Sequence, residues 1–317
     1  MLRALAIAAT AVMMAAPASF ALAAPQVVAT TKPLHSLVAS VMAGVGEPVL
    51  LVKGAASAHT YSLRPSDARA LGAADVVFWT GHGMELFLDG ALETLAPDAA
   101  IVALAETEGL ELLPIREGGA FEPHVHGIEA GHDHDHDHDH AHGHDEADMH
   151  YWLDPDNAAL MVGQIAQTLA DADPQNAAAY RENAAAEAAR LTALTADLET
   201  ILAPARGRSF VVFHDAYQYF EQRFGLTVAG TITVSPDVPP GAQRIADLRE
   251  RVQDDDVACI FAEPQFEPAV VRTIAEGTGV RVATLDPEGA GLEEGATLYD
   301  QLLRGLATAI ADCVAGE

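Results

Sequence analysis

Short apolar runs alternate with helix-like segments along most of this 317-residue chain, and this alternation restricts the possible folds more than any other feature. Runs of four or five residues rich in valine and isoleucine predict strands, while the longer segments between them have the spacing of amphipathic helices. Strands that alternate with helices are typical of parallel sheets covered by helices. The chain is therefore predicted to be an α/β protein.

The predicted elements form two groups of similar order. In the first half, strands are predicted at 27–31, 49–52, 76–79 and 101–104, with helices beginning near Pro33, Ser66 and Met84. In the second half, strands are predicted at 210–213, 227–230, 259–262 and 281–285, with helices at 216–224, 242–253, 269–276 and 298–314. A chain of this length with two such groups predicts two lobes, each with a small parallel sheet flanked by helices.

The strongest helical pattern, at 174–203, lies between the two groups. Asp173 can cap this helix, Pro174 suits its first position and Pro204 ends it. Apolar residues recur every three or four positions, and thirty helical residues would span roughly 45 Å. A coiled-coil dimer would use the same pattern, but the register is short and rich in alanine. We therefore predict one rigid linker helix between lobes at 24–173 and 204–317.

The first 23 residues have the composition of a signal peptide. Arg3 precedes an apolar run at 5–16 that is too short to span a bilayer, and small residues just before Ala24 suit cleavage. No cysteine comes directly after the apolar run, which excludes a lipid anchor there, and the rest of the chain has no second apolar stretch near 20 residues. We expect an exported, soluble protein. In an oxidising compartment Cys259 and Cys313 favour a disulfide, with two unrelated buried thiols as the alternative.

The chain is strongly acidic, with 46 Asp and Glu residues against 17 Lys and Arg residues and a formal charge of −29. Such a surface repels phosphates, so nucleic acid is not expected to be a partner. Two interpretations of the acidity remain open: it attracts cations, or it keeps the protein soluble.

The segment 121–149 is rich in histidine and aspartate and contains no lysine or arginine. Its polar composition cannot supply a hydrophobic core, so we predict a disordered loop that collects metal ions with low affinity. A solvated acidic loop without a metal role is the alternative. The predicted auxiliary ligands alternate with acidic or small residues: His132, His134, His136, His138, His140, His142 and His144.

Four potential ligands follow predicted strands or precede a helix, where open α/β sheets place their binding sites. These residues are His59, His150, His214 and Asp286. Three imidazoles and one carboxylate satisfy a tetrahedral Zn²⁺ ion. The sequence therefore predicts that folding gathers these four side chains into the principal metal site.

Five other residues are weaker candidates. His35 and His82 also follow predicted strands, but they are more simply explained as surface histidines. Asp154 and Asp215 neighbour predicted ligands and could accept the second N–H of an imidazole, as metal-bound histidines usually require. Glu263 is a candidate by its position alone, and a structural role is the simpler explanation.

Five segments carry a resemblance to a known family. They read His59-Thr-Tyr-Ser-Leu-Arg-Pro-Ser-Asp67, Phe213-His-Asp-Ala-Tyr217, Pro240-Gly-Ala-Gln-Arg-Ile245, Phe261-Ala-Glu-Pro-Gln-Phe266 and Thr284-Leu-Asp-Pro287. In this order, with a His/Asp-rich loop before the second ligand, the chain resembles the periplasmic zinc-binding proteins of ABC importers, the ZnuA type of the zinc/manganese-binding group. The resemblance extends over essentially the whole chain after the signal peptide.

The resemblance implies two α/β lobes joined by one long helix, with the metal in the cleft between them. His59 and His150 would come from the first lobe, and His214 and Asp286 from the second. Manganese-specific relatives tend to carry a carboxylate at the position of His214, so an imidazole there favours zinc. Some zinc-specific relatives have a glutamate before the first histidine, where this chain has Ala58. The fourth ligand is then Asp286 or a water.

The resemblance also implies the disulfide between Cys259 and Cys313, a periplasmic location and a monomer. The function it implies is capture of Zn²⁺ and delivery to an inner-membrane ABC permease, with a periplasmic zinc chaperone as a further candidate partner. Zinc would be the cargo and the protein would not be an enzyme. A zinc hydrolase would need an open coordination position, which Asp286 would close. A metal buffer or a surface adhesin is the third alternative.

Overall fold

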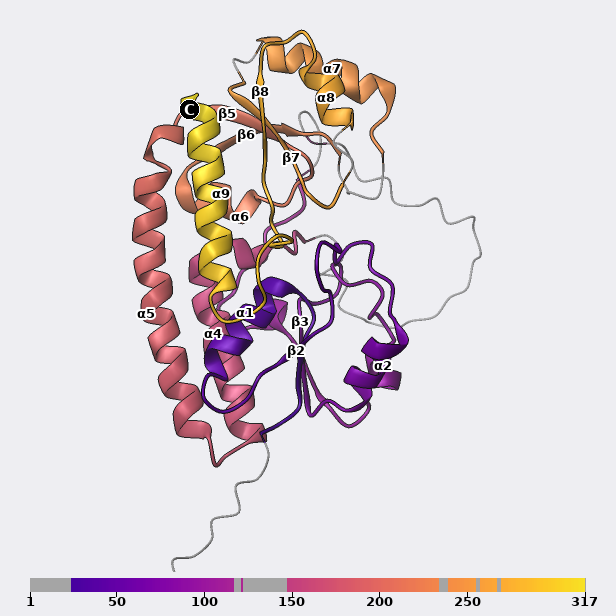
Figure 1. Ribbon diagram of the computed structural model, residues 1–317, viewed down its shortest axis with the longest axis vertical. Coiled ribbons are helices and arrows are strands. Elements are labelled where there is room, and N and C mark those ends of the chain that lie inside the picture. The colour runs from indigo at the N-terminus through magenta and orange to yellow at the C-terminus, as the bar shows by residue number, and fades with distance from the viewer. Residues whose placement is uncertain are drawn as a thin grey trace, which may run out of the picture.

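The structure is a computed structural model that describes residues 24–116, 121, 147–233, 239–254, 257–266 and 269–316. The predicted signal peptide at 1–23 and the auxiliary histidines lie outside these residues. Two four-stranded parallel sheets, one from each half of the chain, lie at opposite ends of the molecule (Figure 1). The predicted α/β fold is confirmed.

The first sheet has the strand order β2-β1-β3-β4. Its strands are β1 (Val27–Ala29), β2 (Val49–Leu50), β3 (Val76–Trp79) and β4 (Ala100–Ala103). Its helices are α1 (Lys32–Val41), α2 (Pro65–Gly72) and α3 (Leu92–Leu95). The central strands β1 and β3 are buried along their whole length, as expected for strands covered on both faces. The predicted helix near Met84 is wrong, because turns occupy that segment and α3 begins only at Leu92.

The second sheet repeats this topology with the order β6-β5-β7-β8. Its strands are β5 (Ser209–Val212), β6 (Thr227–Thr231), β7 (Cys259–Ala262) and β8 (Arg281–Thr284). Its helices are α6 (Gln218–Phe224), α7 (Ala242–Asp254), α8 (Ala269–Ala275) and α9 (Leu298–Ala315). In each sheet the second strand in chain order pairs with one side of the first strand, and the third strand pairs with its other side. The direction in which strands are added therefore reverses at the first strand. Binding sites of such sheets lie outside the carboxyl ends of the strands at this switch point.

Two long helices connect the halves, α4 (Pro155–Ala172) and α5 (Ala177–Ile201). Helix α4 is absent from the sequence predictions, although Asp154 caps it by accepting from the Asp156 backbone N–H at 2.8 Å. Helix α5 begins three residues later than predicted. Asp173 ends α4 and does not cap α5, and its carboxylate accepts from the Tyr180 hydroxyl at 3.0 Å.

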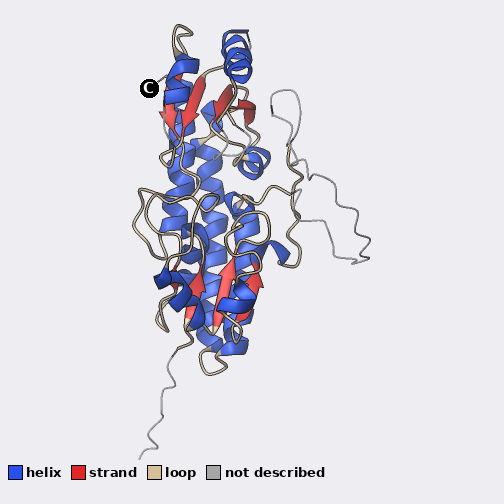
Figure 2. Cartoon of the chain, turned by 90° about the vertical axis from the view of Figure 1, so that its right-hand side faces the viewer, coloured by secondary structure: helices blue, strands red, loops and turns tan. Residues whose placement is uncertain are grey.

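The long helices share one hydrophobic core with both sheets. The buried face of α5, which includes Tyr180, Leu191, Leu194 and Leu198, packs with α4, α1 and α9. Figure 2 shows these helices as a column that continues from one sheet to the other. Two smaller hydrophobic clusters complete the core, one in each half. The halves therefore meet through packed helices, and the predicted lobe boundaries at residues 173 and 204 stay a prediction.

The predicted disulfide is present. Cys259 at the start of β7 is bonded to Cys313 on α9, 54 residues later, with the two Cα atoms 6.1 Å apart. The bond attaches the last helix to the second sheet. Among the described residues, no helix combines the length and apolar character that crossing a membrane requires.

Candidate metal centre

Three of the four predicted ligands converge between the halves. His59 follows β2, His150 immediately precedes the 3₁₀ helix η2 (Tyr151–Leu153), and His214 lies two residues after β5. One ring nitrogen from each histidine lies within 4.8 Å of the other two. His150 and His214 are buried and His59 is partly buried. The site therefore gathers residues that are up to 155 positions apart in the sequence.

The spacing of the ring nitrogens suits a tetrahedral ion. The Nε2 atom of His150 lies 3.2 Å from Nε2 of His59 and 3.3 Å from Nε2 of His214. Ligand nitrogens at 2.0–2.1 Å from a tetrahedral Zn²⁺ are about 3.3 Å apart. The Nε2 atom of His150 thus lies at the separation that zinc requires from the Nε2 atoms of both other imidazoles, and the ring nitrogens of all three histidines lie within 4.8 Å of one another.

Buried carboxylates hold two of the imidazoles from behind. His150 Nδ1 lies 2.8 Å from Asp148 Oδ1, and His214 Nδ1 lies 2.8 Å from both oxygens of Glu263. A carboxylate that accepts the Nδ1–H places the lone pair of Nε2 toward the centre and fixes the orientation of the ring. This arrangement is typical of histidines that bind a metal.

The protonation of these groups depends on burial. Burial, reinforced by the charge of His214, holds the pKa of His150 well below its usual range, so its imidazole is neutral and ready to bind a cation. Burial also raises the pKa of Asp148 to about 7. For His214, burial favours the neutral form, but the charge and hydrogen bond of Glu263 outweigh it and raise the pKa. Because a metal ion binds the neutral imidazole, protonation of His214 competes with metal binding.

Asp154 and Asp215, the two residues that the sequence offered as possible partners of an imidazole, have other partners. Asp154 caps α4, and Asp215 accepts hydrogen bonds from the Arg116 guanidinium, which also contacts Glu221 at 2.7 Å. The physical reason is that Asp215 directly follows His214, so the two side chains point to different surroundings. Glu263, for which a structural role was the simpler explanation, is the partner of His214.

Asp286 is not a member of the three-histidine group. Its Oδ1 atom accepts from Gln265 Nε2 at 2.9 Å and from the backbone N–H groups of Glu288 and Gly289 at 3.2 and 2.9 Å. The aspartate thus organises the loop that follows β8. Its assignment as the fourth ligand stays a prediction.

Two acidic residues near the centre were missed by the sequence analysis. Asp148 had a usable signal, because a carboxylate two residues before a histidine can reach its Nδ1 atom. Glu288 had none, since its partners, the Ser57 hydroxyl and the Ala58 N–H, are more than 200 positions away.

The other two histidines of the described residues, His35 and His82, lie outside the centre. His35 is buried and its Nε2 atom lies 3.1 Å from the Pro48 carbonyl oxygen, so it is not a surface histidine. His82 is exposed and pairs with Asp89 at 3.0 Å.

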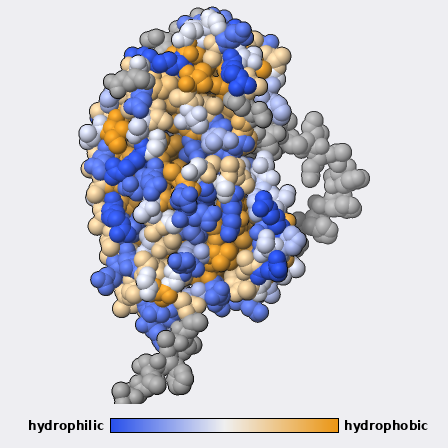
Figure 3. Space-filling model, in the orientation of Figure 1, coloured by the Kyte–Doolittle hydropathy of each residue, from blue (hydrophilic) through white to orange (hydrophobic). Residues whose placement is uncertain are grey.

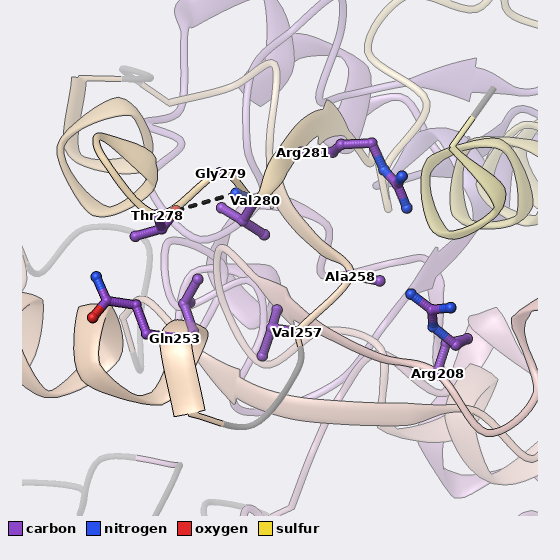
Figure 4. Close-up of a pocket in the computed structure, with 9 residues that line it drawn as sticks. Arg208, Gln253, Val257, Ala258, Thr278, Gly279, Val280 and Arg281 are labelled. Carbon is purple, nitrogen blue, oxygen red and sulfur yellow. Dashed lines mark hydrogen bonds between the residues drawn. The ribbon is translucent and has the colours of Figure 1, made fainter.

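A separate cavity of about 340 Å³ lies at the other end of the second sheet (Figure 4). It is lined by residues just before β5, β7 and β8, among them Arg208, Ala258 and Val280. Among the residues that the structure describes, two arginines and no carboxylate or imidazole line it, and this described lining does not suit a cation.

Comparison with known proteins agrees with this geometry. The family model described as "ZnuA: Zinc-uptake complex component A periplasmic" matches residues 27–313. The chain is 47% identical over 304 residues to the high-affinity zinc uptake system protein ZnuA of Brucella abortus, covering 91% of each chain. It is 37% identical over 314 residues to the protein of that name from Yersinia pestis, covering 96% of each. A crystal structure of ZnuA aligns with a TM-score of 0.74 at 25% identity, covering 91% of this chain and 98% of that one.

The family model extends over nearly all the described residues, and the structural similarity includes both halves. Zinc is the transported cargo of these periplasmic proteins, which are transport components and not enzymes. The chain belongs to the ZnuA family of periplasmic zinc-uptake binding proteins.

Proposed function

We propose that this protein captures Zn²⁺ through His59, His150 and His214 and delivers it to an inner-membrane ABC permease. The observation that carries the proposal is the convergence of three histidine ring nitrogens, with Nε2 of His150 at the distance of tetrahedral zinc ligands from Nε2 of the other two. The buried position of two of the rings favours tight binding, because little water competes for the ion. The names of the relatives support zinc uptake as the purpose of that binding.

Selectivity for zinc follows from the type of ligand. Three imidazoles suit Zn²⁺ better than Mn²⁺, which prefers oxygen ligands. We propose that the fourth position is filled by Asp286 after a change in its hydrogen bonds, or by a water.

Release requires that the ligands move apart. Because α1, α4, α5 and α9 share one core across both halves, we propose a small displacement of the ligand-bearing loops when the permease docks, and not a wide opening of the lobes. Export by the predicted signal peptide at 1–23 and contact with a periplasmic zinc chaperone belong to the same proposal.

We also propose that the protein works as a monomer. Large hydrophobic side chains that are exposed, such as Leu86, Leu160 and Val282, belong to different elements of the fold. Figure 3 shows hydrophilic residues over much of one face, with hydrophobic ones interspersed. Scattered apolar residues of this kind are normal on monomeric proteins.

A competitive titration of the metal-free mature protein tests the proposed function. We expect one tight Zn²⁺ site per chain that Mn²⁺ displaces only at large excess, measured by isothermal titration calorimetry against a chelator of known affinity. Tighter binding of Mn²⁺ than of Zn²⁺ would overturn the selectivity, and a chain without a tight zinc site would overturn the function.

The His/Asp-rich segment is proposed to be an accessory collector of zinc. Its flanking residues are close to the centre: Pro114 forms a bridge with Ala147, and Tyr219 links the two flanks by donating to the Asp148 carbonyl and accepting from the Leu113 N–H, both at 2.8 Å. Ions bound by the segment would therefore be released within reach of His150, at high local concentration.

Deleting residues 131–144 is expected to remove the weak zinc sites and leave one tight site with its affinity unchanged. The stoichiometry at saturating zinc, measured by equilibrium dialysis and metal analysis, should fall to one. A variant in which a Gly/Ser linker of the same length replaces 131–144 controls for the connection between the flanks. Loss of the tight site in both variants would contradict the accessory role.

A further inference from the structure

Glu288 is a buried carboxylate that connects the two halves of the chain beside the metal centre. It lies on the loop after β8 and is 7% exposed. Its Oε1 atom accepts from the Ser57 hydroxyl at 3.0 Å, and its Oε2 atom accepts from the Ala58 backbone N–H at 3.2 Å. Both donors belong to the turn that contains His59 and is closed by the hydrogen bond from the Thr60 N–H to the Ser57 carbonyl at 3.3 Å. One carboxylate of the second half thus binds two successive residues of the first.

The contacts continue from Glu288 to the histidine itself. The Ser57 hydroxyl, which donates to Glu288, accepts from the His59 backbone N–H at 3.3 Å. The side chain of Ala58 is completely buried, so this turn is fixed by packing on one side and by the carboxylate on the other. The position of the His59 backbone therefore depends on Glu288.

Glu288 itself is held in a loop with little freedom. Lys32 on α1 is buried and donates to the carbonyl oxygens of Gly289, Ala290 and Leu292 at 2.9, 3.0 and 3.0 Å. Trp152, two residues after His150, donates from its indole nitrogen to the Pro287 carbonyl at 3.0 Å. Because this loop is fixed at several points, the Glu288 carboxylate can hold the turn at Ser57 and Ala58 in one position. A carboxylate on a flexible loop could not do so.

We propose that Glu288 is a positioning residue that sets the location of His59 in the zinc site. The inference rests on the proposed function and assigns the third ligand a carboxylate support, as Asp148 supports His150 and Glu263 supports His214. The mode differs, because Glu288 holds the backbone of the turn and not the imidazole. The Glu288 carboxylate would thereby couple the affinity for zinc to the relative position of the two halves.

The test compares Glu288→Gln, Ser57→Ala and the double variant with Glu293→Gln as the matched control. Glu293 is an exposed acid on the same loop, so its variant loses the same charge without the buried contacts. A glutamine can accept only one of the two hydrogen bonds. We expect Glu288→Gln and Ser57→Ala each to raise the Kd for Zn²⁺ by about tenfold, the lower end for residues that support a ligand. The Kd of the double variant should be no higher than that of the single variant that binds zinc more weakly, and Glu293→Gln should have the wild-type Kd.

Absorption spectra of the Co²⁺-loaded proteins report the coordination geometry directly. The d–d bands should change in Glu288→Gln and in Ser57→Ala but not in Glu293→Gln, while the melting temperatures of the metal-free proteins verify folding. Wild-type affinity and spectra in both single variants would overturn the inference. Wild-type zinc affinity in Ser57→Ala, together with a lower zinc affinity in Glu288→Gln, would also overturn the inference. Loss of the carboxylate charge alone would then explain the effect. Absence of a tight site in the wild type would instead refute the proposed function.

Discussion

Replacing His150 with alanine is expected to raise the Kd for Zn²⁺ by several hundredfold. The Nε2 atom of His150 is the central one of the three, within 3.3 Å of both others. A tight protein zinc site is worth about 10–16 kcal/mol, so each of four ligands contributes roughly 3–4 kcal/mol. That loss corresponds to a factor of several hundred in affinity. Competition with a fluorescent zinc chelator measures the change.

His82→Ala is the matched control, because it removes an exposed imidazole that lies outside the centre. Since His150 is buried against Asp148, His59→Ala provides a second variant that changes a partly buried loop residue with less risk to folding. Wild-type affinity in both variants, with folding verified by circular dichroism, would show that zinc binds elsewhere. A loss in His82→Ala equal to that in His150→Ala would contradict the site as well.

The sequence was sufficient to predict the sheets and the three histidines that converge between the halves. Strands such as β3 and β7 are continuous apolar runs, and no competing pattern gives those residues another place in an α/β fold. Because parallel strands end at the same edge of a sheet, a histidine after β2 or β5 is brought toward the site by topology alone. His59 and His214 were predictable for this reason.

The partners of the ligands were not predictable in the same way. His214 pairs with Glu263 across 49 residues, and the choice between Glu263 and the adjacent Asp215 depends on side-chain direction at a strand end. Only the fold shows that the Asp215 carboxylate already accepts hydrogen bonds from Arg116. Helix α4 was missed although Asp154 is a good cap and apolar residues recur every three or four positions along its buried face. Local pattern therefore identified the three histidines that converge, while tertiary contacts decided their orientation.

The Cys259–Cys313 disulfide makes a second large effect predictable. A Cys259→Ala/Cys313→Ala double variant is expected to lower the free energy of unfolding by about 4 kcal/mol, the loop-entropy value for a closed loop of this length. Alanine is the suitable replacement, because both positions are buried and a serine hydroxyl would need a partner there. Equilibrium unfolding in guanidinium chloride measures the loss.

A reducing agent provides the internal control. It should lower the unfolding midpoint of the wild type toward that of the double variant and leave the variant unchanged, since only the wild type has a bond to break. Equal midpoints for both proteins without reductant would contradict a stabilising role. The Kd for Zn²⁺ should stay at the wild-type value, because the disulfide is far from the metal centre along the sheet. Cys259 is at the amino end of β7, whereas Glu263 follows the carboxyl end of β7 and His214 follows the carboxyl end of β5. A variant that loses stability but keeps its zinc affinity would show that the disulfide stabilises the packing of α9 on the sheet. The geometry of the histidines would then be set independently, by the buried carboxylates.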